Sequence, residues 1–144
     1  MGPPNNSLQD RNGEETLVTP TAHRLIVAHG NPEYAAQVGR QFRRLGWEVH
    51  TARSGSEVRR LARTVAPQLV VLGAETPQET GWLTCAKLAR EQPRCRIILV
   101  SRDPTPEYHR MARFVGGAAL VQQDAGAGAL LDEVYGEANL PAVG

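Results

Sequence analysis

Short runs of mainly apolar residues alternate along the chain with segments of helical periodicity. The runs are RLIVA (24–28), WEVHTA (47–52), LVVL (69–72), RIILV (96–100) and AALV (118–121). Runs of this length, rich in β-branched and aliphatic side chains, are typical of strands. LVVL is apolar at every position, which indicates a strand that is covered on both faces.

The segments between these runs carry apolar side chains at helical spacing. The first helix is expected in NPEYAAQVGRQFRRLG (31–46), where Asn31 can cap the start and Gly46 the end. The second helix begins near Ser54, which forms an S-x-x-E capping box with Glu57. Three further helices are expected over residues 82–91, 106–115 and 125–138.

Alternation of five strands with five helices predicts an α/β fold, a doubly wound parallel sheet with helices on both faces. In such a sheet, sites lie beyond the carboxyl ends of the strands, near the point where the strand order reverses. The residues to examine therefore follow the strands. They are Ala28–Asn31, Gly73–Thr76, Ser101–Asp103 and Gln122–Asp124.

One domain over residues 23–138 is expected, because this length buries a core without disulfides or metal. Residues 1–22 are rich in Pro, Gly and Asn and predict a flexible tail, and residues 139–144 predict a short second tail. Cys85 and Cys95 are interpreted as two reduced thiols, which is typical of a cytoplasmic protein. The sequence has no apolar run near the ~18 residues that a membrane span needs.

The net charge of +1 gives no overall field that would recruit nucleic acid or a membrane. Charge is nevertheless uneven. Residues 36–66 hold seven arginines and two glutamates, whereas residues 122–144 hold four acids and no Lys or Arg. These segments are either solvated helix faces of opposite sign or a docking surface for a partner.

Several stretches together resemble the receiver domain of bacterial response regulators. They are LIVAHGNPE (25–33), LGWEVHTARSGSEV (45–58), PQLVVLGAETPQETGW (67–82), RIILVSRD (96–103) and GGAALVQQ (116–123). The resemblance extends from about Arg24 to Ala138. It implies a flavodoxin/CheY-like five-stranded parallel sheet with the strand order 2-1-3-4-5.

Receivers of the usual kind accept a phosphoryl group from a histidine kinase on an aspartate at the end of the third strand. Two acids after the first strand hold Mg²⁺, a lysine contacts the phosphate and a hydroxyl senses it. By position, the resemblance assigns the acid pair to His29 and Gly30, and the phosphoacceptor to Gly73. The lysine falls on Gln123, the aromatic switch on Leu120 and the hydroxyl on Ser101, which alone is kept.

A shift of the alignment does not restore the missing groups, because aspartate and lysine are scarce. The aspartates are Asp10, Asp103, Asp124 and Asp132, and Lys87 is the one lysine. None of these aspartates lies beside the first or third strand. We therefore expect a pseudo-receiver with no phosphotransfer, no enzymatic activity, no bound Mg²⁺ and no cofactor.

Polar side chains remain around the pocket in which receivers of the usual kind are phosphorylated. His29, Glu75 and Ser101 are expected to hydrogen-bond one another or water. A His29–Glu75 pair would raise the pKa of His29, so a pH sensor is kept as an alternative. Asp103 either reaches the rim of the pocket or caps the helix that follows it.

The resemblance also implies an interaction face made by the fourth helix, the fifth strand and the fifth helix. Its candidate residues are Tyr108, Arg110, Arg113, Asp132 and Glu133, with Trp82 at the start of the third helix. We expect the domain to bind a protein partner or a second copy of itself, either as a stand-alone adaptor or as part of a longer protein. The alternative is a regulatory domain that binds a small ligand, or nucleic acid through the arginines of the first two helices.

Overall fold

The computed structural model describes residues 23–75 and 80–136, in which strands and helices alternate. The strands are β1 (Arg24–Ala28), β2 (Glu48–Thr51), β3 (Leu69–Gly73), β4 (Arg96–Ser101) and β5 (Ala119–Gln122). The helices are α1 (Pro32–Arg44), α2 (Gly55–Val65), α3 (Gly81–Glu91), α4 (Pro106–Phe114) and α5 (Gly126–Tyr135), with a short 3₁₀ turn η1 (Gln123–Ala125) before α5.

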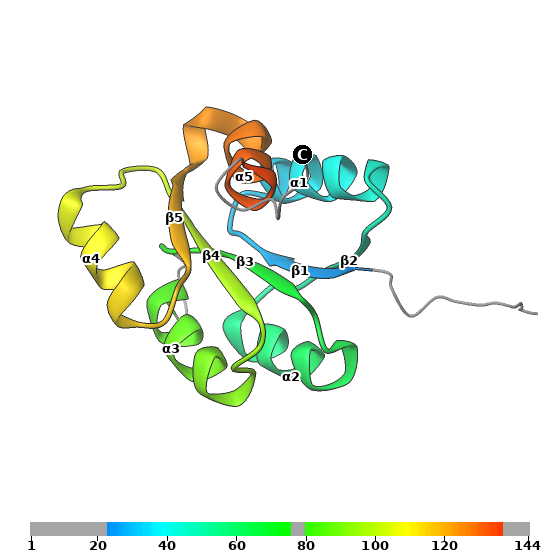
Figure 1. The fold of residues 1–144 in the computed structure, drawn as a ribbon, viewed down its shortest axis with the longest axis horizontal. Helices are drawn as coiled ribbons and strands as arrows, with labels where there is room; N and C mark the ends of the chain where they lie inside the picture. Colours follow the sequence, from blue (N-terminus) through cyan, green and yellow to red (C-terminus); the bar gives the residue numbers. More distant parts are fainter. Residues whose placement is uncertain (1–22, 76–79, 137–144) are drawn as a thin grey trace, which may run out of the picture.

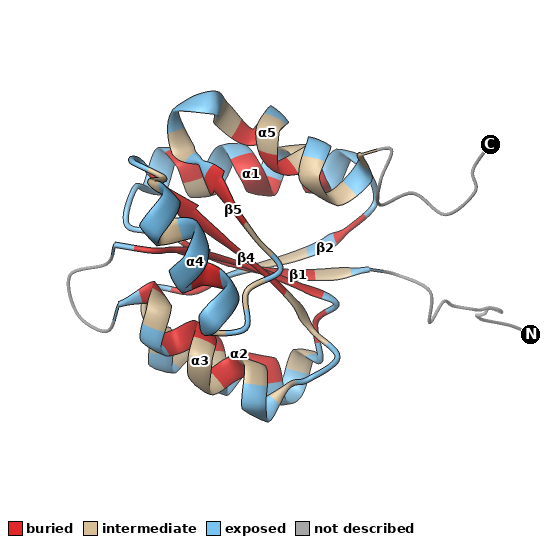
Figure 2. Ribbon diagram, turned by 60° about the vertical axis from the view of Figure 1, so that its left-hand side comes forward, coloured by how far each residue is buried: buried red, intermediate tan, exposed pale blue. Residues whose placement is uncertain are grey.

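The five strands form one parallel sheet in the order β2-β1-β3-β4-β5 (Figure 1). Helices α1 and α5 pack together on one face, and α2, α3 and α4 cover the other (Figure 2). The predicted doubly wound α/β fold with the strand order 2-1-3-4-5 is confirmed. The strand order reverses between β1 and β3, so this pair of strands marks the switch point.

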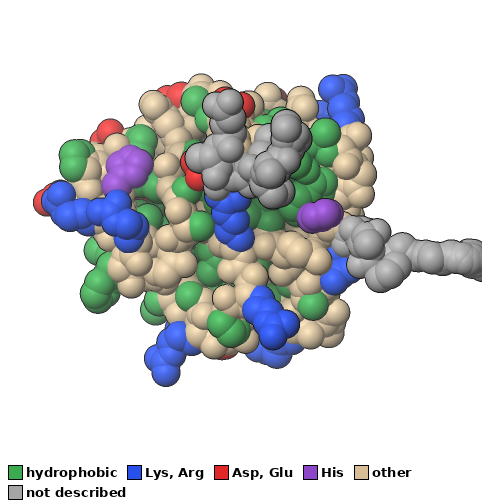
Figure 3. Space-filling model, in the orientation of Figure 1, with side chains coloured by type: hydrophobic (Ala, Val, Ile, Leu, Met, Phe, Trp, Pro, Cys, Tyr) green, Lys and Arg blue, Asp and Glu red, His purple; other side chains and the backbone are tan. Residues whose placement is uncertain are grey.

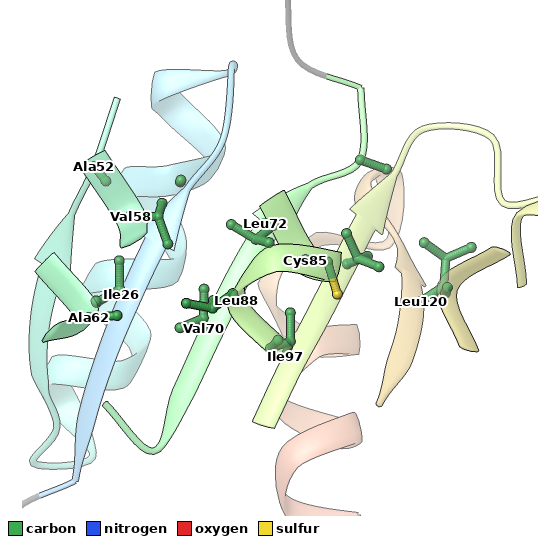
Figure 4. Packing of buried hydrophobic residues seen from close by; sticks show 14 residues of the cluster. Ile26, Ala52, Val58, Ala62, Val70, Leu72, Cys85, Leu88, Ile97 and Leu120 are labelled. Atoms are coloured by element: carbon green, nitrogen blue, oxygen red, sulfur yellow. The ribbon is translucent and has the colours of Figure 1, made fainter. Parts of the chain in front are cut away.

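Alternation of side chains along the strands divides the core into two clusters, one on each face of the sheet. Val70 and Leu72 of β3 face α2 and α3, whereas Leu69 and Val71 face α1 and α5. Figure 4 shows the cluster beneath α2 and α3, in which Val58, Cys85 and other buried side chains meet the sheet. All residues of β3 are buried, as its apolar sequence predicted.

The helix starts follow the capping chemistry of the sequence. The Asn31 side chain accepts hydrogen bonds from the backbone N–H groups of Glu33 and Tyr34. The Ser54 hydroxyl accepts from the N–H of Glu57, whose carboxylate accepts from the N–H of Arg53. The predicted caps of α1 and α2 are therefore confirmed.

Two local predictions need correction, and a third concerns residues that the structure does not describe. The cap of α4 is Thr105, whose hydroxyl accepts from the N–H of Tyr108, so the interpretation of Asp103 as that cap is wrong. The last helix begins at Gly126 because η1 precedes it, and it ends at Tyr135. The predicted tails at 1–22 and 139–144 lie outside the described residues.

Both cysteines are free thiols, and burial raises the pKa of Cys85 to about 11 and that of Cys95 to about 12. Thiols with such values are inert as nucleophiles at neutral pH. Within residues 23–75 and 80–136, none of the helices combines the length and apolar composition that a membrane span requires.

Candidate functional site

The register of the sheet brings the polar residues that follow the strands to one edge. Ala28 of β1 lies beside Leu72 of β3, and Gly73 lies beside Val100 of β4. The side chains after these strand ends therefore meet across the carboxyl edge, near the switch point between β1 and β3. They are His29, Glu75, Ser101, Arg102 and Gln123.

His29 is half-buried at this edge and is held on several sides. Its Nδ1 accepts a hydrogen bond from the backbone N–H of Asn31 at 3.0 Å, and its ring centroid lies 4.7 Å from that of Tyr34. Burial lowers the pKa of His29, and the positive charge of Arg102 acts in the same direction. A hydrogen bond with Gln123 and the charge of Glu75 act in the opposite direction but do not outweigh burial. Glu75 acts in the expected direction, but the net effect on the pKa of His29 is a lowering, so the imidazole is mainly neutral at pH 7.

Gly73 ends β3 directly against the His29 ring. A Cβ atom at residue 73 would lie 3.0 Å from His29 Cδ2 and 3.4 Å from both Cγ and Nε2. Carbon atoms this close leave no room for a longer side chain unless the ring moves. A side chain at the end of β3 would therefore meet the imidazole at its Cβ atom, and the ring would have to shift by a few tenths of an ångström.

Gly81 brings α3 against the same strand end. Its N–H donates to the carbonyl oxygen of Ala74 at 3.1 Å. A Cβ atom at residue 81 would approach the carbonyl oxygen of Gly73 to 2.1 Å, so only glycine fits where α3 begins.

Glu75 and Ser101 join the ends of β3 and β4. The Ser101 hydroxyl donates to Glu75 Oε2 at 2.6 Å and accepts from the backbone N–H of Asp103 at 3.1 Å. Ser101 is fully buried, whereas Glu75 is exposed. The hydrogen bond of the Glu75 carboxylate is with Ser101, and its influence on His29 is a through-space charge effect.

A model of the response regulator receiver domain matches residues 25–135 of the chain. The chain belongs to the response regulator receiver family. Among curated proteins, this receiver domain is 29% identical over 93 residues to the probable transcriptional regulatory protein TcrX of Mycobacterium tuberculosis. That match covers 65% of the chain and 40% of the relative, so the chain spans less than half of that protein.

Solved structures with the same fold include the chemotaxis protein CheY4 of Vibrio cholerae, with a TM-score of 0.75 and 16% identity over 80% of this chain and 98% of that one. The receiver domain of the putative response regulator NarL of Mycobacterium tuberculosis has a TM-score of 0.70 and 22% identity, with 82% and 100% coverage. A Burkholderia pseudomallei response regulator with a phosphorylated aspartic acid, calcium and citrate has a TM-score of 0.71 and 20% identity, with 76% and 65% coverage.

The remaining predicted site residues of this receiver domain occupy different environments. Leu120 is buried against the α2–α3 face, Gln123 lies in η1 beside His29, and Gly30 is exposed with open space around its Cα. Within the described ranges, no group of three or more His, Cys, Asp or Glu side chains is placed to hold a metal ion.

Two neighbours of His29 were not predicted as part of the site. Tyr34 lies in the first turn of α1, where its hydroxyl is buried without a hydrogen-bond partner and burial raises its pKa to about 12. Arg102 follows Ser101 directly, which is the signal that could have identified it. Both residues come from loops or helix starts at the carboxyl edge, where sequence spacing alone does not specify which side chains meet.

The candidate partner-binding residues lie on both sides of the edge strand β5. Trp82 and Tyr108 are half-buried and form an edge-to-face pair, with ring centroids 5.1 Å apart, that joins α3 to α4. Arg110 and Arg113 of α4 and Asp132 of α5 are exposed. Glu133 accepts a hydrogen bond from Arg96 of β4 at 3.3 Å, so its carboxylate is already engaged within the chain.

Proposed function

We propose that this receiver domain is a pseudo-receiver that signals through protein–protein contact and carries out no phosphotransfer. The contact between His29 and Gly73 carries this proposal. Residue 73 offers no carboxylate, and the Cβ atom of any side chain there would press against the His29 ring. An acyl phosphate requires a carboxylate nucleophile at that position.

The residues at the carboxyl edge do not fit Mg²⁺. This ion prefers oxygen ligands in an octahedral arrangement, usually with carboxylates among them. Gly30 and Gly73 offer no side chain, and His29 Nδ1 already accepts the Asn31 N–H. The Glu75 carboxylate accepts the Ser101 hydroxyl instead. We therefore derive no phosphoryl-transfer step through a metal ion.

The hydrogen bond between Ser101 and Glu75 supports a receiver held in one state. In the family, the hydroxyl at this position senses the phosphoryl group. Here a carboxylate of the chain itself accepts that hydroxyl at 2.6 Å, and the N–H of Asp103 completes the arrangement at 3.1 Å. Signalling would then depend on whether a partner is present and not on a change of the Ser101 position.

The exposed surface of α4 supports a contact with a protein. Phe114 is 88% exposed and Met111 is 44% exposed, and both lie outside the stripe of α4 that packs against the sheet. Figure 3 shows hydrophobic, basic, acidic and His side chains close together on the side of the molecule where α4 lies, and further acidic side chains toward η1 and α5. A mixed surface with exposed aromatic and arginine side chains is favourable for protein recognition.

A second copy of the chain is the partner that this charge distribution fits best. Arg110 and Arg113 lie on α4, and Asp124 and Asp132 lie in η1 and α5, on the two sides of β5. In a two-fold dimer across β5, the basic helix of one copy faces the acidic helix of the other, and each contact occurs twice. Exposed Met111 and Phe114 would add apolar area to the same interface.

A nucleic-acid interface has less support from the arginines of α1 and α2. These helices cover opposite faces of the sheet, so their side chains do not form one basic surface (Figure 2). The Arg59 side chain also hydrogen-bonds the Glu91 carboxylate, and Arg60 contacts Glu57. Phosphate binding requires clustered cations on one surface.

A charge-swap experiment tests the proposed dimer. Sedimentation of the wild-type chain should show a monomer–dimer equilibrium, and Arg113→Asp or Asp132→Arg alone should weaken it about tenfold or more. The double variant should recover much of the affinity, because the two charges exchange sides. Arg94→Asp, outside α4 and α5, is the matched control. A wild-type chain that stays monomeric would exclude self-association and leave a different protein as the partner.

A further inference from the structure

A cleft of about 520 Å³ opens at the switch point between β1 and β3, on the side of the sheet edge toward β2. The ends of β1 and β3 form its floor, with Ala28, Leu72 and Gly73. The first turns of α1, the loop between β2 and α2, and the start of α3 form its walls. The volume lies in the range of pockets that hold small organic molecules.

Small side chains keep this cleft open. The lining includes Gly30 in the loop after β1, Gly73 at the end of β3, Ala35 and Ala36 of α1, and Gly55 of α2. Gly30 has no heavy atom within 4 Å of the position that a Cβ would take, so the space beside it is open. The surface of the cleft is mainly apolar, since carbon atoms of these residues face it.

The lining of the cleft contains no anionic side chain and no lysine, and its one arginine, Arg53, is exposed. The start of α2 is satisfied by its own side chains, because Ser54 accepts from Glu57 N–H and Glu57 accepts from Arg53 N–H. A charge buried on the floor of the cleft, against Ala28, Leu72 and Gly73, would have no opposite charge beside it, whereas an uncharged group carries no such penalty.

Thr84 lines the cleft and has a buried hydroxyl group. It lies one turn into α3 and is 1% exposed, and its hydroxyl has no hydrogen-bond partner in the structure. Threonine and valine have nearly the same shape, so packing alone does not require a hydroxyl here. A ligand group that hydrogen-bonds Thr84 would satisfy an otherwise unpaired buried polar atom.

We propose that this cleft binds a small, uncharged, mainly apolar molecule with a hydrogen-bonding amide or hydroxyl group that pairs with Thr84. The site shares His29 and Gly73 with the carboxyl edge, so its ligand lies against the residues that replace the phosphorylation chemistry. It does not include α4 or α5 and does not depend on the proposed dimer.

The experiment measures amide chemical-shift changes by NMR on the full chain with matched neutral and anionic probes. The neutral probes are nicotinamide, benzamide and 2-phenylethanol, and the anionic probes are nicotinate, benzoate and phenylacetate. At millimolar concentration, a range typical of weak small ligands, at least one neutral probe should shift the amides of Gly30, Thr51, Gly55 and Thr84. Its anionic counterpart should bind at least several-fold more weakly.

Two variants connect the shifts to the cleft. Gly30→Leu should fill the open space and abolish the shifts, whereas Gly128→Leu, whose surroundings in α5 are equally open, should leave them unchanged. Thr84→Val should weaken binding about five- to tenfold, the effect of losing one hydrogen bond. Its melting temperature should be equal to or above that of the wild type, which separates loss of binding from loss of folding.

Three results would overturn the proposal. One is that none of the neutral probes shifts these amides, and a second is that the anionic probes bind more tightly than the neutral ones. The third is that Thr84→Val binds like the wild type while Gly30→Leu does not. None of these results changes the expected sedimentation of the charge-swap variants, so failure of this inference is distinguishable from failure of the proposed dimer.

Discussion

The imidazole of His29 lies against the position that a Cβ atom at residue 73 would take. The ring is fixed by the Asn31 N–H on Nδ1, by the Tyr34 ring and by Gln123. Residues 29 and 73 are therefore coupled, and the effect of a substitution at one on stability depends on the identity of the other. A side chain at residue 73 requires either a small shift of the His29 ring or a smaller residue at position 29.

We expect Gly73→Asp to lower the free energy of unfolding by about 1–3 kcal/mol, because the new side chain overpacks against the His29 ring. The double variant Gly73→Asp with His29→Ala should recover part of that loss. Urea unfolding of the single and double variants measures the coupling. The matched control is Gly30→Asp, where the space is open. Equal losses at residues 73 and 30 would contradict the proposed contact.

His29 gives the domain a pH-dependent stability whose sign follows from its lowered pKa. In the unfolded chain the imidazole titrates near its ordinary value of about 6.5, and in the folded domain it titrates lower. As the pH falls, the unfolded state therefore binds the proton first. The contribution of His29 to the free energy of unfolding is complete above about pH 6.5. It is lost as the pH falls from that value toward the folded pKa.

Urea unfolding at about pH 7.5 and at about pH 5.5 tests this pH dependence. The wild type should lose up to about 1.4 kcal/mol for each tenfold rise in proton concentration within the window, and His29→Gln should lose less. His109→Gln is the control, because that histidine is exposed on α4. Identical pH dependence in the wild type and His29→Gln would show that His29 is not held neutral.

At the scale of single elements, apolar pattern and capping chemistry were sufficient to predict most of the fold. β1 and the caps of α1 and α2 follow directly from RLIVA, Asn31 and the Ser54–Glu57 box. The site was harder to predict, because its contacts join loops whose order in space the spacing does not specify. Glu75 could have paired with His29 or Ser101, and the burial that decides the pKa of His29 has no signature in sequence.

The docking of α3 against β3 depends on one residue without a side chain. Gly81→Ala would place a Cβ atom 2.1 Å from the carbonyl oxygen of Gly73, so α3 must move away from the strand. We expect a loss of about 3 kcal/mol in the free energy of unfolding, at the upper end for overpacking. Gly128→Ala, which has open space in α5, is the control. A loss below about 0.5 kcal/mol at residue 81 would show that α3 starts elsewhere.

On the scale of the whole molecule, the receiver fold separates three regions. The carboxyl edge holds the His29–Gly73 contact, the cleft opens beside it toward β2, and the α4–β5–α5 surface lies around the opposite edge strand. In the proposed function, the carboxyl edge carries no phosphotransfer, and the buried apolar strands hold the three regions in place. Signalling is then proposed to depend on contacts that these surfaces make.

The central claim is that this receiver domain does not accept a phosphoryl group, and its most direct test is intact mass spectrometry after incubation with acetyl phosphate and Mg²⁺. The Burkholderia pseudomallei response regulator whose structure contains a phosphorylated aspartic acid serves as the positive control. We predict an unchanged mass for this chain under conditions that phosphorylate the control. A stoichiometric mass increase of one phosphoryl group would contradict the account.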